Sequence, residues 1–211
     1  MKKKLSRMKF NPNKIEVIHY GIDTERFSLR RTRKMRKIIY VGRLDKERNV
    51  EFLLHIFSKL MDKNLRFEII GDGGYFHKLR ELSIKLHIWK KVKFQGVICN
   101  ELLPQYYNSA LFYVNAFPYE TLGISMVEAM ACGLPVVALD SPGAREVIDD
   151  GKNGFIVKDM SQFKEKCELL LQDEKLRRMM GKKARRSVEK KFSLRKYVRD
   201  MEKISSSLIF I

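Results

Sequence analysis

The chain has 211 residues, of which 45% are hydrophobic and 32% charged, a composition typical of one or two globular domains and not of a disordered or collagen-like protein. Its 43 lysine and arginine residues outnumber its 25 aspartate and glutamate residues, which gives a net charge of +18. The widely spaced Cys99, Cys132 and Cys167 exclude a disulfide scaffold and a zinc ribbon, and they favour a reducing cytoplasm.

Short β-branched runs alternate with amphipathic stretches along most of the chain. The runs predict buried strands, and the stretches predict helices because their apolar residues recur at helical spacing. Strands are predicted at residues 37–41, 66–70, 92–94, 111–115, 135–139 and 155–157. Helices are predicted at residues 49–61, 76–86, 101–109, 124–132, 144–148, 161–171, 174–191 and 194–206, with Asn49 and Asn100 as N-caps of the first and the third.

This alternation indicates the fold class. Strands that are apolar on both faces and separated by helices predict a parallel sheet covered on both sides, which is a Rossmann-like, doubly wound α/β domain. Ligands of such domains bind at the carboxyl ends of the strands. The most apolar window, residues 122–139, contains Glu128 and Pro135, so it predicts a helix, a turn and a buried strand instead of a membrane span.

The positive charge is concentrated at the two ends of the chain. Residues 1–37 and residues 175–203 each have a net charge of +10, whereas residues 38–174 have a net charge of −2. Basic ends fit contact with anionic lipid or an acidic partner, and they fit an ordinary solvated surface equally well. Since nucleic-acid-binding proteins more often carry basic residues on the folded recognition surface, we expect no nucleic-acid partner.

Several chemistries lack their motifs in this sequence. The four histidines have no metal-ligand spacing with each other or with cysteine, and there is no G-x-S-x-G hydrolase elbow. The P-loop pattern is absent, and so is the D-x-D pair that many transferases use to hold a metal on a diphosphate. We therefore expect neither a metal nor a cofactor.

Two segments carry candidate chemistry. The first, Gly42–Arg48, follows a predicted strand directly, so Arg43 and Arg48 are expected near the carboxyl edge of the sheet. Arginine binds phosphate through planar bidentate contacts and keeps its charge. The alternative is that both are solvated loop arginines in a chain rich in basic residues. Gly71-Asp72-Gly73-Gly74 after the next strand predicts a turn and gives only a weak phosphate-loop signal.

The second segment runs from Glu120 to Val137 and places a loop carboxylate ahead of a glycine that opens a helix. A helix amino terminus offers free N–H groups to an anion. Glu128 then lies on an otherwise apolar helix, where a carboxylate costs free energy unless another group satisfies it. We expect Glu128 to bind sugar or ribose hydroxyls; the alternative is a residue satisfied by a neighbouring lysine or a backbone amide.

The ordered motifs resemble the carboxyl-terminal half of retaining family 4 (group 1) glycosyltransferases of the GT-B fold, over roughly residues 15 to 200. The spacing E-x7-E, running into Glu-Ala-Met-Ala-Cys-Gly-Leu-Pro-Val-Val, is the most specific element. The other motifs are Tyr20-Gly21-Ile22-Asp23-Thr24-Glu25-Arg26-Phe27, Val41-Gly42-Arg43-Leu44, Ile70-Gly71-Asp72-Gly73, Phe94-Gln95-Gly96-Val97 and Asp150-Gly151-Lys152-Asn153-Gly154-Phe155.

The resemblance implies a domain that binds a nucleotide-diphosphate sugar for transfer to an acceptor hydroxyl in polysaccharide or glycolipid synthesis. Arg43 and Arg48 would hold the diphosphate, and Glu120 would bind hydroxyls of the donor sugar. Glu128 would bind the ribose. Backbone N–H groups near Leu122, Gly123 and Ile124 would face the phosphate and sugar, and the base would lie near Gly96, Val97 and Ile98.

The sequence departs from the family pattern at a few positions. Arg48 stands where the family usually has lysine, Ala116-Phe117 stands where it often has Pro-Ser, and Tyr20 stands where it usually has asparagine. The interdomain linker signature lies within the first residues, so the acceptor-binding half is expected in a separate partner or a longer form. Residues 1–36 would be a linker remnant and basic extension, residues 37–192 the nucleotide-sugar-binding domain, and residues 193–211 a crossing helix.

Two other functions remain open from the sequence. The chain could be a non-catalytic nucleotide-sugar-binding module that acts only with an acceptor-domain partner, which activity of the isolated chain would distinguish. A basic nucleic-acid-binding domain is the weaker alternative, and strongly salt-dependent binding to DNA or RNA would favour it. We expect a cytoplasmic protein. Any contact with the inner face of the membrane is expected to involve its basic ends.

Overall fold

A computed structural model describes residue 11, residues 15–30, residue 32 and residues 34–209, with the side chains of residues 207–209 excepted. Six parallel strands form one sheet in the order β3-β2-β1-β4-β5-β6. The strands are β1 (Lys37–Val41), β2 (Arg66–Ile70), β3 (Val92–Phe94), β4 (Tyr113–Asn115), β5 (Val136–Leu139) and β6 (Gly154–Val157). The order reverses at β1, which pairs with both β2 and β4, so this is the predicted doubly wound sheet.

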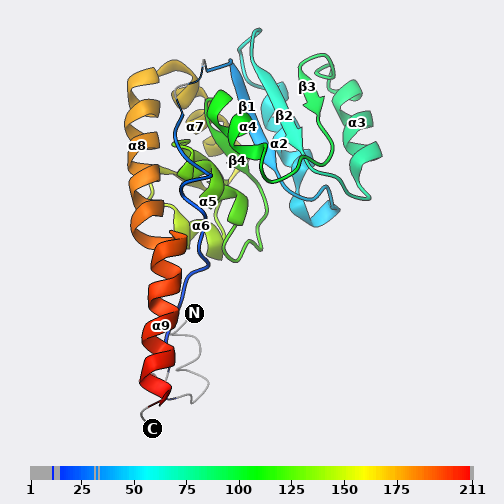
Figure 1. Cartoon of the computed structure of the whole chain (residues 1–211). Coiled ribbons are helices and arrows are strands. Elements are labelled where there is room, and N and C mark those ends of the chain that lie inside the picture. The colour runs from blue at the N-terminus through cyan, green and yellow to red at the C-terminus, as the bar shows by residue number, and fades with distance from the viewer. Residues whose placement is uncertain (1–10, 12–14, 31, 33, 210–211) are drawn as a thin grey trace.

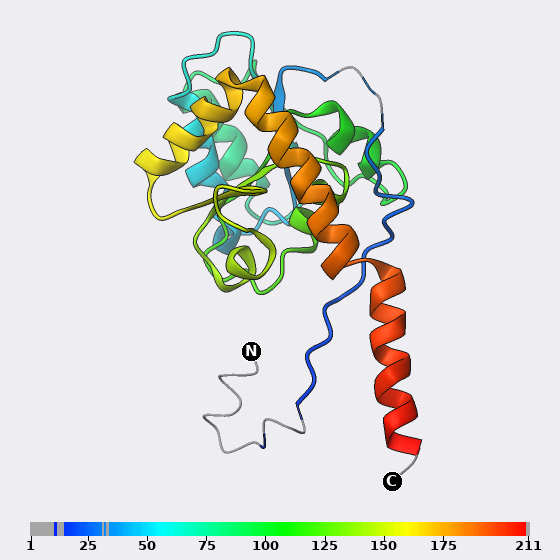
Figure 2. The same ribbon diagram turned by 90° about the vertical axis from the view of Figure 1, so that its left-hand side faces the viewer.

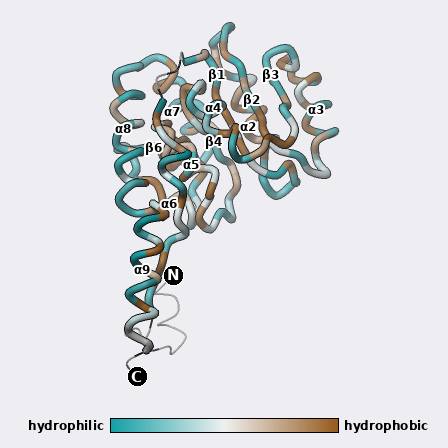
Figure 3. Tube along the Cα trace, in the orientation of Figure 1, coloured by the Kyte–Doolittle hydropathy of each residue, from teal (hydrophilic) through white to brown (hydrophobic). Residues whose placement is uncertain are grey.

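Helices cover both faces of the sheet (Figure 1). On one face, α2 (Val50–Ser58), α3 (Phe76–Lys85) and α7 (Met160–Gln172) pack with alternate strand residues such as Ile38 and Tyr40. On the other face, α4 (Leu103–Ser109), α5 (Ile124–Ala131) and α6 (Pro142–Val147) pack with Ile39 and Val136. The long α8 (Glu174–Lys191) lies against α5, and its outer side is mostly hydrophilic (Figures 1 and 3).

Of the two asparagines expected as N-caps, Asn49 occupies the N-cap position of α2 without a side-chain cap hydrogen bond, and Asn100 is not the N-cap of α4. Asn49 precedes α2 but has a left-handed backbone, and its Nδ2 donates to the carbonyl of Ala116 at 3.3 Å. The helix α4 begins at Leu103, so Asn100 lies before its first turn, and Asn100 Oδ1 accepts from Arg26 Nη1 at 3.1 Å. In both cases a distant part of the chain takes the side chain that local sequence assigns to a cap. The short 3-10 helix η2 (Lys46–Arg48) was not predicted.

The carboxyl-terminal helix α9 (Leu194–Ile209) continues beyond α8 and extends away from the sheet (Figures 1 and 2). The segment before β1 meets this junction, because Ile22 N donates to the Phe192 carbonyl at 2.7 Å and Leu194 N donates to the Ile22 carbonyl at 2.9 Å. Leu194, Val198 and Met201 on α9 are exposed. No helix within the described residues has the length and the apolar character needed to cross a membrane.

Candidate functional site

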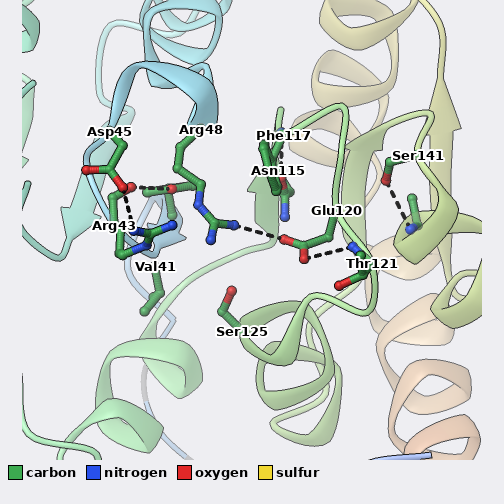
Figure 4. Close-up of polar contacts among 12 residues, drawn as sticks. Val41, Arg43, Asp45, Arg48, Asn115, Phe117, Glu120, Thr121, Ser125 and Ser141 are labelled. Atoms are coloured by element: carbon green, nitrogen blue, oxygen red, sulfur yellow. Dashed lines mark hydrogen bonds and ion pairs between the residues drawn. The ribbon is translucent and has the colours of Figure 1, made fainter.

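The loops that follow β1 and β4 meet at the carboxyl edge of the sheet, because these strands are neighbours at the point where the strand order reverses. The first loop carries Arg43 and Arg48, and the second carries Glu120. Arg48 Nη1 donates to Glu120 Oε2 at 3.3 Å, and the two side chains point toward each other (Figure 4). The fold thus brings together two residues predicted to serve one site, 72 positions apart in the chain.

Arg48 is held in a partly buried position. Its guanidinium carbon lies 4.3 Å from the centre of the Phe117 ring, and only 24% of its side chain is exposed. Its Nε is buried and has no hydrogen-bond partner among the described residues. The alternative of a solvated loop arginine therefore does not describe Arg48.

Arg43 differs from Arg48 in its surroundings. Its side chain is 71% exposed, and its Nη1 lies 2.9 Å from Asp45 Oδ2. The hydroxyl of Tyr40 donates to the Arg43 carbonyl at 2.9 Å and fixes the backbone of this loop. The structure places Arg43 at the expected edge of the sheet as a cation that is open to solvent (Figure 4).

The glycines of residues 71–74 bring the loop after β2 against the loop after β1. A Cβ atom on Gly71 would lie 1.9 Å from the Gly42 carbonyl oxygen, so only glycine fits this approach. Leu44 N donates to the Asp72 carbonyl at 2.9 Å, and Tyr75 N donates to the Leu44 carbonyl at 2.9 Å. The loop acts as the predicted turn and supports the backbone that carries the two arginines.

The amino terminus of α5 faces the same edge. Gly123 begins it with a φ of 73°, a conformation that glycine adopts without strain. Ser125 in the first turn lies 2.9 Å from the Tyr113 hydroxyl, and that hydroxyl also contacts the Val41 carbonyl at 3.1 Å. The first N–H groups of a helix have no partner within it, so those around Leu122, Gly123 and Ile124 fit the predicted role toward an anion.

Glu128 is buried on α5, and the hydroxyl of Tyr107 donates to its Oε2 at 3.0 Å. Burial raises the pKa of Glu128, while hydrogen bonds from Tyr107 and Asn100 lower it in part. The same burial, together with the neighbouring Glu128, raises the pKa of the Tyr107 hydroxyl. The lysine or backbone amide considered from the sequence is not the partner; two uncharged side chains are.

Residues 96–98 form the loop after β3. The Gly96 carbonyl accepts from Gly71 N at 2.8 Å, which joins this loop to the one after β2. Val97 is 77% exposed, whereas Ile98 packs against the core on the α5 face. The exposed apolar side chain of Val97 fits the predicted place for a base. No cluster of three or more histidine, cysteine, aspartate or glutamate side chains that could hold a metal occurs in the described part of the chain.

Phe117 and Tyr107 belong to the site and were not singled out from the sequence. Phe117 was noted only as a departure from the family pattern, although its place two residues after a strand at the ligand edge was a usable signal. Tyr107 gave no signal, because a tyrosine at helical spacing looks like an ordinary core residue.

Comparisons with known proteins identify the family of the chain. Residues 21–187 match the family model described as glycosyl transferases group 1. The chain is 33% identical over 195 residues to sulfoquinovosyl transferase SQD2 of Arabidopsis thaliana, covering 84% of this chain and 37% of that protein. It is 31% identical over 209 residues to N-acetyl-alpha-D-glucosaminyl L-malate synthase of Bacillus anthracis, covering 92% and 54%. The chain thus spans between about a third and half of these relatives.

Solved structures share the fold. Anabaena HepE in complex with UDP and glucose superimposes with a TM-score of 0.87 at 19% identity, covering 98% of this chain and 60% of that one. The carboxyl-terminal domain of the group 1 glycosyl transferase LpcC from Francisella tularensis gives a TM-score of 0.74 at 22% identity, covering 82% of this chain and all of that one. The fold is therefore that of the carboxyl-terminal domain of a GT-B glycosyltransferase.

Proposed function

This chain belongs to the glycosyl transferases group 1 family, and from that premise we propose that it is the donor-binding domain of a retaining glycosyltransferase of the hexosyl type. It binds a nucleotide-diphosphate sugar and presents the glycosyl group to an acceptor hydroxyl of a growing polysaccharide or a glycolipid. The observation that carries the proposal is the meeting of Arg48 with Glu120 beside the amino terminus of α5. UDP and glucose in the HepE complex support a nucleotide sugar as the ligand.

The donor diphosphate lies between the arginines and the start of α5. Arg43 and Arg48 supply fixed positive charge, and the N–H groups around Gly123 add hydrogen bonds with the favourable end of the helix dipole. This preorganised arrangement stabilises the negative charge that develops on the diphosphate as it leaves. No metal is needed for that step in this proposal.

The sugar and the ribose are bound by the two carboxylates. Glu120 accepts hydrogen bonds from donor-sugar hydroxyls beside Arg48, which binds the diphosphate, and Glu128 binds the ribose from the α5 side. The base lies against residues 96–98. Departure of the diphosphate leaves an oxocarbenium-like centre, and the acceptor hydroxyl attacks from the same face, which retains the configuration.

A second domain or a partner chain binds the acceptor in this proposal, because the residues assigned above bind only the donor. Closure of two domains excludes water and aligns the acceptor, and alignment is worth about 7–11 kcal/mol of barrier. The other candidate, a module that binds nucleotide sugars without catalysis, is distinguished by a radiolabelled-donor transfer assay. Donor binding without transfer by the isolated chain, and transfer once the acceptor domain is added, is the result expected for the enzyme.

A thermal-shift panel of UDP-, GDP- and ADP-sugars tests donor binding directly. A ligand at 100 times its dissociation constant stabilises the folded state by about 2.7 kcal/mol, which is easily measured. One nucleotide series should raise the melting temperature, and the matching bare nucleoside should do so much less. A panel in which no nucleotide sugar has an effect would overturn the proposed function.

A membrane surface carrying anionic lipid is a further partner that we propose, and α8 is the element that meets it. Its exposed side, which faces the viewer in Figure 2, carries basic residues and the exposed Met179. Charge attracts such a stripe to anionic headgroups. The basic residues concerned are Lys175, Arg178, Lys182, Lys183, Arg186 and Lys190.

Sedimentation with vesicles of phosphatidylglycerol and phosphatidylcholine tests this surface. Changing Lys175, Lys182 and Arg186 together to glutamate should abolish sedimentation. The matched control changes Lys63, Lys85 and Lys93, which are exposed and lie outside α8, to glutamate with the same net charge. Equal loss in both triple variants would mean that net charge, and not α8, governs binding.

A further inference from the structure

The guanidinium of Arg48 has fewer partners than its burial calls for. It makes one hydrogen bond of 3.3 Å, to Glu120, and its buried Nε has no partner within the described chain. A guanidinium has five N–H donors and keeps its charge in proteins. The contact that restricts its position is therefore the Phe117 ring, 4.3 Å from its central carbon.

Phe117 is fixed by the same two loops that build the site. Its backbone N–H donates to Asn115 Oδ1 at 2.8 Å, at the end of β4. Asn49, the residue after Arg48, donates from Nδ2 to the carbonyl of Ala116 at 3.3 Å. The ring is half-buried, and its place relative to Arg48 is thus set from both ends of the contact.

We propose that Phe117 is a positioning residue for the donor diphosphate and acts only through Arg48, an inference that rests on the proposed function. With Nε buried, the Nη groups are the donors left for a ligand. The ring restricts the guanidinium, so its Nη groups stay beside Glu120 and the amino terminus of α5, where the diphosphate is proposed to bind. A guanidinium is planar and can donate two parallel hydrogen bonds to a phosphate, and a ring that restricts its orientation lowers the entropy lost when it does so.

The proposal explains why two departures from the family pattern occur together. Arginine at position 48 is longer and planar where lysine is a compact point charge, and a planar cation gains from an aromatic face beneath it. Ala116-Phe117 supplies that face. The two unusual residues contact each other although the sequence separates them by 69 positions.

A double-mutant cycle tests the coupling. Isothermal titration measures binding of UDP, GDP and ADP to the protein, and the tightest is then used throughout. Phe117→Leu keeps apolar volume and removes the ring, and we expect it to weaken diphosphate binding about fivefold, the size of one partly exposed cation–π contact. In an Arg48→Ala background the same change should have no effect, because nothing remains for the ring to hold.

Three controls separate positioning from folding. Phe117→Tyr should restore the affinity, and binding of the bare nucleoside should be unchanged in every variant. Tyr119→Leu removes the neighbouring exposed ring, which meets Phe117 edge-on at 6.0 Å, and should have no effect. Melting temperatures identify any variant that fails to fold, and Phe117→Met then replaces Phe117→Leu.

The outcomes are distinct. If Phe117→Leu weakens binding equally in both backgrounds, or does not weaken it at all, the positioning role is overturned and the proposed function stands. If none of the three diphosphates binds the unaltered protein, the proposed function fails and the inference falls with it. The proposal is supported if Phe117→Leu weakens binding only in the protein that keeps Arg48, and only for ligands that carry phosphates.

Discussion

The two carboxylates of the E-x7-E spacing lie in regions of opposite character. Glu120 lies in the loop after β4 and is balanced by a cation, because Arg48 donates to it at 3.3 Å. Glu128 lies on α5 and forms no ion pair within the described part of the chain; Tyr107 donates to it at 3.0 Å, and burial raises its pKa. The same residue type at a fixed spacing therefore meets two environments. The first carboxylate is coupled to the proposed diphosphate site, and the second is insulated from it.

Arg48→Ala should affect the two regions most differently, because it removes the counter-ion of Glu120 and leaves the contacts of Glu128 unchanged. We expect nucleoside diphosphate binding to weaken by about 1.5–3 kcal/mol, the range for hydrogen bonds to charged groups. Titration calorimetry measures the loss. Arg43→Ala is the matched control, and it should cost less because this side chain is largely exposed and pairs with Asp45. Equal losses for the diphosphate and for the bare nucleoside would show that Arg48 supports the fold instead.

Gly123→Ala acts at the position between the two regions. Alanine is strained at the φ of 73°, and its Cβ would lie 2.2 Å from Met126 Cε and 3.1 Å from Glu120 Cγ. We expect a loss of about 1–3 kcal/mol in the free energy of unfolding, measured by urea denaturation. The control is Gly151→Ala, where φ is 71° and no atom lies within 4 Å of the added Cβ. If both variants lose the same stability, backbone strain alone matters and the packing against Glu120 does not.

Tyr107→Phe should act on the Glu128 region alone. It removes a hydrogen bond to a buried carboxylate, which should cost about 1–2 kcal/mol at neutral pH. Losing this donor also raises the pKa of Glu128 further, so the cost should shrink as the pH falls toward 4.5 and the carboxylate becomes protonated. Chemical denaturation at several pH values measures it. Tyr106→Phe, which removes a hydroxyl without a hydrogen bond in the described structure, should show no such pH dependence.

Most of the fold was predictable, because short buried runs and amphipathic stretches carry their own signal. The strands β1, β2 and β3 begin and end at the predicted residues. Asn49 was right as the N-cap of α2, although its side chain donates to Ala116 and not to the helix, and Asn100 was wrong as a cap because it accepts from Arg26. Contacts with distant parts of the chain cannot be predicted from the local sequence.

The candidate site divides in the same way. Charged residues at strand ends, such as Arg48 and Glu120, were predictable because a charge next to a buried strand is unusual. The aromatic residues of the site, Phe117 beside Arg48 and Tyr107 beside Glu128, were not, because an aromatic side chain is ordinary in any core. The sequence also gave no sign that the two carboxylates would differ in their counter-ions, since that depends on which loops the sheet order brings together. The ligand roles of these residues stay predictions.

Glu128→Gln should have the smallest effect on stability. The sign of that effect distinguishes a residue that binds the ribose from one that supports the fold. Because burial raises the pKa of Glu128 above its usual 4.5, the folded state favours the protonated carboxyl. That contribution is fully present below pH 4.5 and is lost as the pH rises through the raised pKa. Glutamine imitates the protonated form and still accepts from Tyr107. The variant should therefore melt at the same or a higher temperature than the unaltered protein at pH 7, and the difference should fade toward pH 4.5.

Its binding of a ribonucleotide should weaken more than its binding of the 2′-deoxyribonucleotide, because a neutral amide accepts the ribose hydroxyls less strongly than a carboxylate. A lower melting temperature at pH 7, with equal loss for both nucleotides, would show that Glu128 serves the fold and that only Glu120, beside its cation, belongs to the donor site.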